Sequence, residues 1–261
     1  MAQSFFKIIA LAAVMITGYS HAQMFNTRDR MDNLESFDLQ KFSWGFYLGL
    51  NNFDYKIVLN PRYGMDGQKN LVQSKSSYSF GAGLIGKMRL NDSFDLRLEP
   101  GLQFVDRELT FDTQVNDRYA GGTTTNDPFL PIALTDADRI RNVKATYIDV
   151  PLLIEYHGDR WYNSRPYVAT GVNWMMNLQS NSGSADDNQQ GIFRTTSSNF
   201  AWSAEIGMQF YFGRFKLTPG FRGTFMINDE TVADNASTPP YWAAAMATTK
   251  TRAFMFVLKF E

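Results

Sequence analysis

The chain has 261 residues, a formal net charge of -1 and no cysteine. That length suits one large domain, and the balanced charge excludes the basic surface expected of a protein that binds nucleic acid. Without cysteine the chain has no disulfide framework, no thiolate metal site and no lipid-acceptor cysteine after a leader.

The first 22 residues have the pattern of a secretory signal peptide. Lys7 precedes an apolar run at 8–16, and Ser20-His21-Ala22 gives a small-x-small ending. This pattern predicts cleavage after Ala22. The apolar run is too short to span a bilayer as a helix, and no other apolar stretch of about 20 residues follows it, so a helical membrane protein is not expected.

Residues 23–41 are polar and charged and show no strong period. We interpret them as a lead-in that lies in the periplasm. The predicted organisation is therefore a signal peptide at 1–22, a periplasmic lead-in at 23–41 and a barrel domain at 42–261.

From Phe42 onward, apolar residues alternate with polar or small ones in eight segments. Each is long enough to cross a bilayer as a tilted strand of about 9 to 11 residues. Successive side chains of a strand point to opposite faces, so each segment has one apolar face and one polar face. The segments are 42–53, 77–89, 93–104, 146–156, 166–177, 200–212, 215–228 and 251–260.

The connections between these segments alternate in length. Short connections lie at 91–93, 157–165 and 213–214, and long ones at 54–76, 106–145, 178–199 and 229–250. This alternation predicts an all-β fold, an eight-stranded antiparallel transmembrane β-barrel of the outer membrane with short periplasmic turns and long extracellular loops. A closed barrel also leaves no unpaired edge in lipid.

A soluble β-sandwich or a lipocalin-like barrel is the competing interpretation, with the apolar faces turned inward. It fits less well, because its core would hold many bulky side chains while its surface displayed glycine and alanine. A narrow membrane barrel has the opposite need, since its lumen accommodates small residues.

Aromatic residues gather at the ends of the segments, as expected if their rings occupy the two membrane interfaces. The rings predicted at the short-turn rim are Phe42, Phe94, Tyr156, Phe212, Phe215 and Phe260. Those predicted nearer the loop rim are Tyr78, Phe104, Tyr147, Trp174, Trp202 and Phe225.

The polar faces carry charges of both signs. The positions predicted to point into the barrel are Lys87, Arg97, Lys216, Arg222 and Lys259 against Asp95, Glu99, Asp149, Glu155 and Glu205. Because a desolvated charge without a partner costs several kcal/mol, this balanced set predicts a salt-bridged structural network. Eight strands enclose room only for side chains, and an ion-selective pore more often has a ring of one sign. A proton or ion path is the alternative.

Residues suited to catalysis or metal binding are scarce. Known barrel hydrolases use a histidine near the rim, but His21 leaves with the leader and His157 is interpreted as a residue of a short periplasmic turn. The acidic pairs at 136–138 and 186–187 match no complete calcium loop and are interpreted as solvated charge. We therefore expect no enzyme activity, cofactor, metal or small-molecule substrate.

The loop at 106–145 contains an apolar cluster in an otherwise polar stretch. Its members are Phe129, Leu130, Ile132 and Leu134. Exposed apolar residues often mark a contact with a partner protein, although these residues could instead fold the loop onto the barrel rim.

Residues 37–57 resemble the start of the PorT family of Bacteroidetes outer-membrane proteins. The resemblance rests on a Lys-x-x-x-Gly-Phe-x-Leu-Gly core at Lys41, Gly45, Phe46, Leu48 and Gly49. Residues 96–111 and 146–156 are similar to that family's third and fourth strands, and also to a broader set of small Bacteroidetes barrels.

The resemblance implies a component of the type IX secretion system, which moves proteins with a dedicated C-terminal signal domain across the outer membrane and exports adhesins in gliding species. It implies no catalytic residue. The implied partners are outer-membrane lipid and other type IX secretion components. A general small barrel for adhesion or envelope integrity is the main alternative, and an enzyme with an unrecognised site is a weaker one.

Overall fold

The computed structural model describes residues 33–61, 64–112, 139–184, 193–233 and 242–261. All of them belong to one compact unit, Asn33–Glu261. Within these ranges no helix combines the length and apolar character needed to cross a membrane. The described helical elements are short 3-10 turns at Phe37–Leu39 and Ala243–Ala245.

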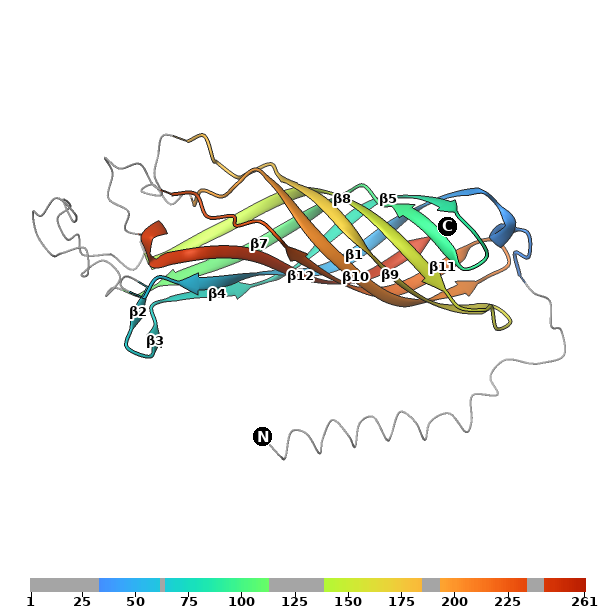
Figure 1. The fold of residues 1–261 in the computed structure, drawn as a ribbon, viewed down its shortest axis with the longest axis horizontal. Coiled ribbons are helices and arrows are strands. Elements are labelled where there is room, and N and C mark those ends of the chain that lie inside the picture. The colour runs from blue at the N-terminus through green and yellow to red at the C-terminus, as the bar shows by residue number, and fades with distance from the viewer. Residues whose placement is uncertain (1–32, 62–63, 113–138, 185–192, 234–241) are drawn as a thin grey trace, which may run out of the picture. The chain divides into compact units, whose positions relative to one another are not determined.

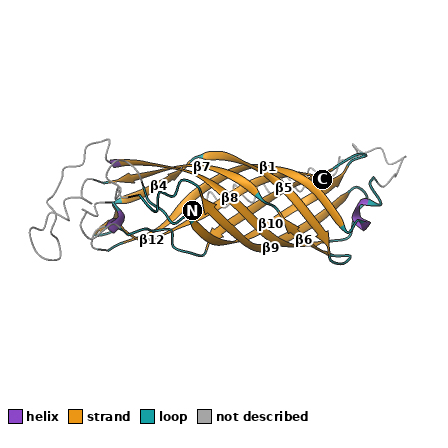
Figure 2. Ribbon diagram, turned by 90° about the horizontal axis from the view of Figure 1, so that it is seen from above, coloured by secondary structure: helices purple, strands orange, loops and turns teal. Residues whose placement is uncertain are grey.

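The described residues form a closed antiparallel barrel with eight membrane-crossing strands, which confirms the predicted fold (Figures 1 and 2). β1 closes the barrel, because it pairs with β12 on one side and with β5 on the other. The crossing strands are β1 (Phe42–Leu59), β5 (Tyr78–Arg89), the interrupted β6 (Phe94–Leu98) and β7 (Gly101–Phe111), β8 (Ile140–His157), β9 (Ser164–Asn177), β10 (Ser198–Tyr211), β11 (Lys216–Met226) and β12 (Met246–Phe260).

The third predicted segment is divided into β6 and β7 at Glu99 and Pro100. Proline has no amide hydrogen for the ladder, so strand pairing is interrupted there. The strand nevertheless stays in place, because Glu99 N–H donates to the Pro151 carbonyl at 3.1 Å and Pro100 O accepts from Leu84 N–H at 2.9 Å. Both halves lie between β5 and β8.

Alternation decides which side chains face the membrane. In β10, Phe200, Trp202 and Ile206 are exposed on the outer face, whereas Ser203 and Glu205 are buried inside. Outward apolar residues lie in hydrocarbon and inward polar residues meet partners across the lumen, which is the pattern of a transmembrane barrel.

Several strands extend further on the loop side than predicted. β1 reaches Leu59 instead of residue 53, β7 reaches Phe111, and β8 begins at Ile140 instead of residue 146. The predicted loops 54–76 and 106–145 therefore include strand residues. In these extensions most outward positions are polar, such as Lys56, Asp106 and Lys144, so the apolar repeat weakens although the hydrogen-bonded ladder continues.

The predicted first loop also contains additional strands. β2 (Met65–Asp66) and β3 (Lys69–Asn70) form a small hairpin, and β4 (Val72–Ser76) pairs with β7 beyond the membrane. These short strands enlarge the loop side of the barrel, which Figure 1 shows beside β7 and β12.

Aromatic contacts occur at both ends of the outer surface. On the turn side, Phe94 lies 5.2 Å from Tyr156 and Phe212 lies 4.9 Å from Phe215, measured between ring centroids. On the loop side, Trp202 stacks on Phe225 at 4.8 Å. The prediction that Tyr147 lies at this outer rim is wrong. Tyr147 is one of the alternate residues of β8 that point into the lumen, and it is fully buried there.

Candidate functional site

A charged network crosses the middle of the lumen and joins six of the ten residues predicted there. Arg97 Nη2 lies 2.6 Å from Glu99 Oε1 and 2.8 Å from Glu205 Oε1, and its Nη1 pairs with Glu155. Arg222 pairs with Glu99 and donates from Nε to Glu205 at 2.7 Å. Lys259 Nζ lies 3.1 Å from Glu99 and also pairs with Glu205. Three cations therefore share three carboxylates.

Neutral side chains also donate hydrogen bonds to two of these carboxylates, Glu205 and Glu155. Tyr167 donates its hydroxyl to Glu205 at 2.7 Å, and Gln209 donates its amide to Glu155 at 2.6 Å. The Tyr167 ring has space because glycines flank it: a Cβ at Gly220 would lie 2.5 Å from the Tyr167 hydroxyl. The small residues inside the barrel therefore make room for a polar ring.

The other four predicted lumen residues lie outside this network. Lys87 Nζ pairs with Asp95 at 3.1 Å, and Lys216 pairs with Glu261, a partner that sequence analysis missed. Asp149 Oδ1 accepts a hydrogen bond from Asn173 at 2.9 Å and has no ion pair among the described residues. By their ion pairs, the ten residues thus fall into the central network, the pair of Lys87 with Asp95, Lys216 with Glu261, and Asp149.

His157 differs from its prediction. It ends β8, with its side chain buried in the lumen, instead of lying in a turn. Its Nε2 is 3.3 Å from Asp95 Oδ2. The inward phase of β8 continues through His157, and the turn begins only after it.

Part of the lead-in closes the turn side of the barrel. Asp38, in the 3-10 turn Phe37–Leu39, accepts a hydrogen bond from the Tyr211 hydroxyl at 2.8 Å. Arg160 and Arg165 each approach its carboxylate at 3.5 Å. Asn33 N–H donates to the Asn163 side chain at 2.8 Å. We call residues 33–39 the turn-side cap.

The ring of Phe37 in this cap lies 4.9 Å from the ammonium of Lys216, inside the turn-side end of the lumen. The cap therefore reaches the Lys216 and Glu261 pair as well as the rim. Residues 23–32 of the predicted lead-in and the predicted signal peptide lie outside the described residues.

A second polar group closes the loop side. Arg107 donates to the Tyr147 hydroxyl at 3.0 Å and to Thr251 Oγ1 at 2.8 Å. Tyr147 in turn donates to Glu230 at 3.1 Å, and Thr251 N–H donates to the same carboxylate at 2.7 Å. Glu230 comes from the connection between β11 and β12, so this loop residue reaches into the barrel mouth.

Above that polar group lies an apolar cluster that covers the loop-side end. Its buried members are Tyr55, Leu71, Val72, Leu109, Phe111, Val143, Phe193, Trp242, Ala245 and Met246. Arg141 lies with its guanidinium 4.2 Å from the Trp242 ring. Together the cap, the central network and this cover fill the lumen at three levels.

Arg107 and Glu230 are not among the predicted lumen residues, for two different reasons. Arg107 continues the inward phase of the third segment, and extending the alternation past Phe104 would have found it. Glu230 follows β11 in a connection without a period, so no local signal identifies it.

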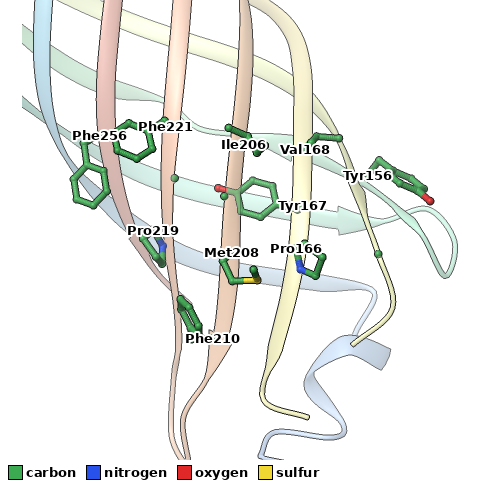
Figure 3. Close-up of a pocket in the computed structure, with 13 residues that line it drawn as sticks. Tyr156, Pro166, Tyr167, Val168, Ile206, Met208, Phe210, Pro219, Phe221 and Phe256 are labelled. Carbon is green, nitrogen blue, oxygen red and sulfur yellow. The ribbon is translucent and has the colours of Figure 1, made fainter. Parts of the chain in front are cut away.

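A shallow groove of about 700 Å³ lies on the outer face over β9, β10 and β11 (Figure 3). Val168, Ile206 and Phe221 line it. Tyr167 lies beneath Gly207 and Gly220 and closes its floor. The groove is thus part of the lipid-facing surface.

Three sets of predicted residues lie outside the part of the chain that the structure describes. The apolar cluster Phe129, Leu130, Ile132 and Leu134 and the acidic pair at 136–138 lie outside the described residues, as does the pair at 186–187. Among the described residues, no group of three or more histidines and carboxylates is arranged to hold a metal ion.

A sequence model of the outer membrane protein beta-barrel domain family matches residues 21–232. The chain belongs to this family. The protein is therefore an integral protein of the cell outer membrane, as the alternation predicted. This membership is broader than the PorT resemblance of residues 37–57. No match to the chain was found among curated proteins.

Several solved structures are similar to this chain. Neisserial surface protein A is 11% identical, covers 84% of this chain and 98% of its own, and has a TM-score of 0.38. Ail, the attachment invasion locus protein of Yersinia pestis, is 9% identical over 85% of this chain and 99% of its own, with a TM-score of 0.36. Outer membrane protein AlkL is 12% identical over 92% and 93%, with a TM-score of 0.46.

Proposed function

We propose that this outer-membrane barrel is a non-enzymatic accessory or assembly component of type IX protein secretion, acting by protein-protein contact. The main support for a role in protein-protein contact is that side chains fill the lumen. They do so at the turn-side cap, at the central network and at the loop-side apolar cluster. A barrel filled in this way offers its rims and outer surface, rather than a channel, to other molecules.

The lumen network has a structural role in this proposal. Glu99 and Glu205 each contact more than one cation and Glu155 pairs with Arg97, so every carboxylate of the central group has a cation within the lumen. Breaking a buried ion pair leaves an uncompensated charge, which strongly destabilises a protein. The network therefore holds the strands in one arrangement.

The secretion role rests on the PorT resemblance of residues 37–57, 96–111 and 146–156. The first experiment is deletion of the gene, followed by quantification of signal-bearing cargo in the medium and the periplasm. We expect cargo to accumulate in the periplasm while an unrelated outer-membrane barrel assembles normally. Unchanged export with weakened adhesion or envelope integrity would instead support a general small barrel.

The partner contact is proposed to involve the apolar residues of the loop at 106–145. In the deletion strain, we expect a chain with Phe129→Asp and Leu130→Asp to fold but not to restore export. Leu178→Asp is a matched control, because Leu178 is an exposed apolar residue on the same side of the barrel. Full export by the double variant would remove this loop from the proposal and leave the rims as the contact.

A further inference from the structure

The outer face of the barrel carries charges directly above the apolar belt, on the loop side. Most of them lie opposite a charge of the other sign on the neighbouring strand, an arrangement that stabilises a sheet. These register pairs are Lys75 with Glu108, Asp106 with Lys144, and Asp54 with Arg252. In the last pair the carboxylate and the guanidinium are 2.7 Å apart.

Lys56 of β1 and Lys250 of β12 break this rule, because they lie directly opposite each other. Lys250 Nζ donates to the carbonyl oxygen of Ile227 at 2.8 Å, and neither ammonium has an ion pair among the described residues. Like charges opposite each other destabilise a sheet. The barrel thus keeps two lysines at one register position of its outer surface, where neither has a carboxylate directly opposite on the neighbouring strand.

The two lysines lie where the apolar surface ends. Two positions along β12 from Lys250, Arg252 lies opposite Phe225. The Phe225 ring stacks on Trp202 at 4.8 Å and meets Phe254 edge-on at 5.9 Å. Aromatic rings mark the interface of a membrane with water, and long lysine side chains reach headgroups from such positions.

A polar cleft of about 560 Å³ adjoins Lys56. It exists because β1 and β5 pair only as far as Asn52 and Tyr78, beyond which β1 faces β4 without a ladder. Asp54 closes the end of the paired region, accepting from Tyr55 N–H and from Ser74 Oγ, both at 2.8 Å. The cleft therefore holds the polar side chains of Asn70, Gln73 and Ser74 and the ion pair of Asp54 with Arg252, beside the Lys56 ammonium.

We propose that Lys56 and Lys250 bind the phosphate groups of an outer-leaflet lipid whose polar headgroup enters the cleft between β1 and β4. Its acyl chains lie against Phe225 and Phe254. A lipid fits this surface because the polar cleft, the two lysines and the aromatic rings lie in succession across the membrane interface. They match the headgroup, the phosphates and the acyl chains of a lipid. A soluble anion would use the lysines alone.

The test uses the full folded chain in a zwitterionic detergent, with diphosphoryl lipid A as the probe and thermal unfolding as the readout. The variant is Lys56→Gln with Lys250→Gln. Lys75→Gln with Lys144→Gln is the matched control, because it also removes two lysines from the same outer face, each of which lies opposite a carboxylate residue.

We expect the first variant to bind the probe about 10- to 30-fold more weakly, since each lysine beside an anionic lipid surface contributes about fivefold. The control should keep wild-type affinity. Without lipid, the first variant should be at least as stable as wild type, because a repulsive pair is gone. Loss of two residues with a merely structural role would lower stability without lipid, and would not weaken lipid binding while leaving that stability unchanged or higher.

Three results would overturn the proposal. The first is an equal loss of affinity for diphosphoryl lipid A in the variant and in the control. The second is undiminished binding of fully dephosphorylated lipid A. The third is stabilisation of the protein by inorganic phosphate that is as strong as stabilisation by the lipid. If the glutamine variant does not fold, the conservative variant Lys56→Arg with Lys250→Arg is tested instead. It keeps both positive charges and must retain lipid binding, so loss of lipid binding in this variant would also overturn the proposal.

Discussion

Arg97 is the residue on which the central network depends most, because its guanidinium contacts Glu99, Glu155 and Glu205. Its side chain is almost completely buried. In Arg97→Ala three carboxylates lose a shared cation, and we expect the free energy of unfolding to fall by about 3 to 5 kcal/mol. Urea titration of the protein folded in lipid vesicles measures this loss.

Arg252→Ala is the control for that prediction. Arg252 also pairs with a carboxylate, Asp54, but its side chain is 46% exposed. An exposed ion pair contributes about 0 to 1 kcal/mol. Similar losses of unfolding free energy in the two variants would show that Arg97 stabilises the barrel no more than an exposed ion pair does.

Tyr167 tests the neutral part of the network. Tyr167→Phe removes the hydroxyl that donates to Glu205 and leaves the ring in place. A hydrogen bond to a charged group contributes about 1.5 to 3 kcal/mol, so the free energy of unfolding should fall by about that amount. Tyr78→Phe, on the lipid-facing surface, should have no measurable effect in the same titration.

Among the elements, the turn-side cap can be tested separately from the strands. Asp38→Ala removes the acceptor for Tyr211 and the anion between Arg160 and Arg165. We expect faster hydrogen exchange of the backbone amides at 33–40, with unchanged exchange in β9 and β10. The physical reason is that few other side-chain contacts hold this short segment against the barrel.

Asp92→Ala provides the comparison for the cap. Asp92 pairs with Arg89 in an exposed turn at the same end of the barrel. It should leave exchange at 33–40 unchanged. If both variants gave the same exchange rates, Asp38 would not be what retains the cap.

The strands show how far sequence alone leads at this scale. Alternation assigned the inward face of β10 and β11 correctly, because a one-residue shift would place Glu205 or Arg222 in lipid. It did not reveal the loop-side extensions of β1 and β8, where the outward face is polar. It also did not show that Arg97 and Arg222 share Glu205, since strand register and not periodicity determines neighbours across a lumen.

At the scale of the whole molecule, the filled lumen predicts a barrel that does not conduct. In planar bilayers we expect no ion conductance above that of the lipid alone, because side chains occupy the space that eight strands enclose. A chain with Asp38→Ala should also remain silent, since the central network lies beyond the cap. Stable single-channel currents from the wild-type chain would contradict the structural interpretation of the ten lumen residues.

The caps could not be predicted because they join segments that are far apart in the sequence. Asn33 contacts Asn163 and Tyr211, and Glu230 contacts Tyr147 and Thr251. Neither the turn-side cap nor the connection that contains Glu230 has an alternation of apolar and polar residues. Each is held by its contacts with the end of the barrel that it covers. The closed barrel was predictable, whereas the means by which each mouth is closed was not.

The pairing of β1 with β12 also has a kinetic consequence. Ser43 and Glu261, which meet at the turn side of this seam, are 218 positions apart in the chain. Contacts between such distant residues form slowly, because the loop between them must be ordered first. Until β12 arrives, β1 has an unpaired edge that can join another chain. The rate of insertion is therefore expected to depend on how that edge is shielded during assembly.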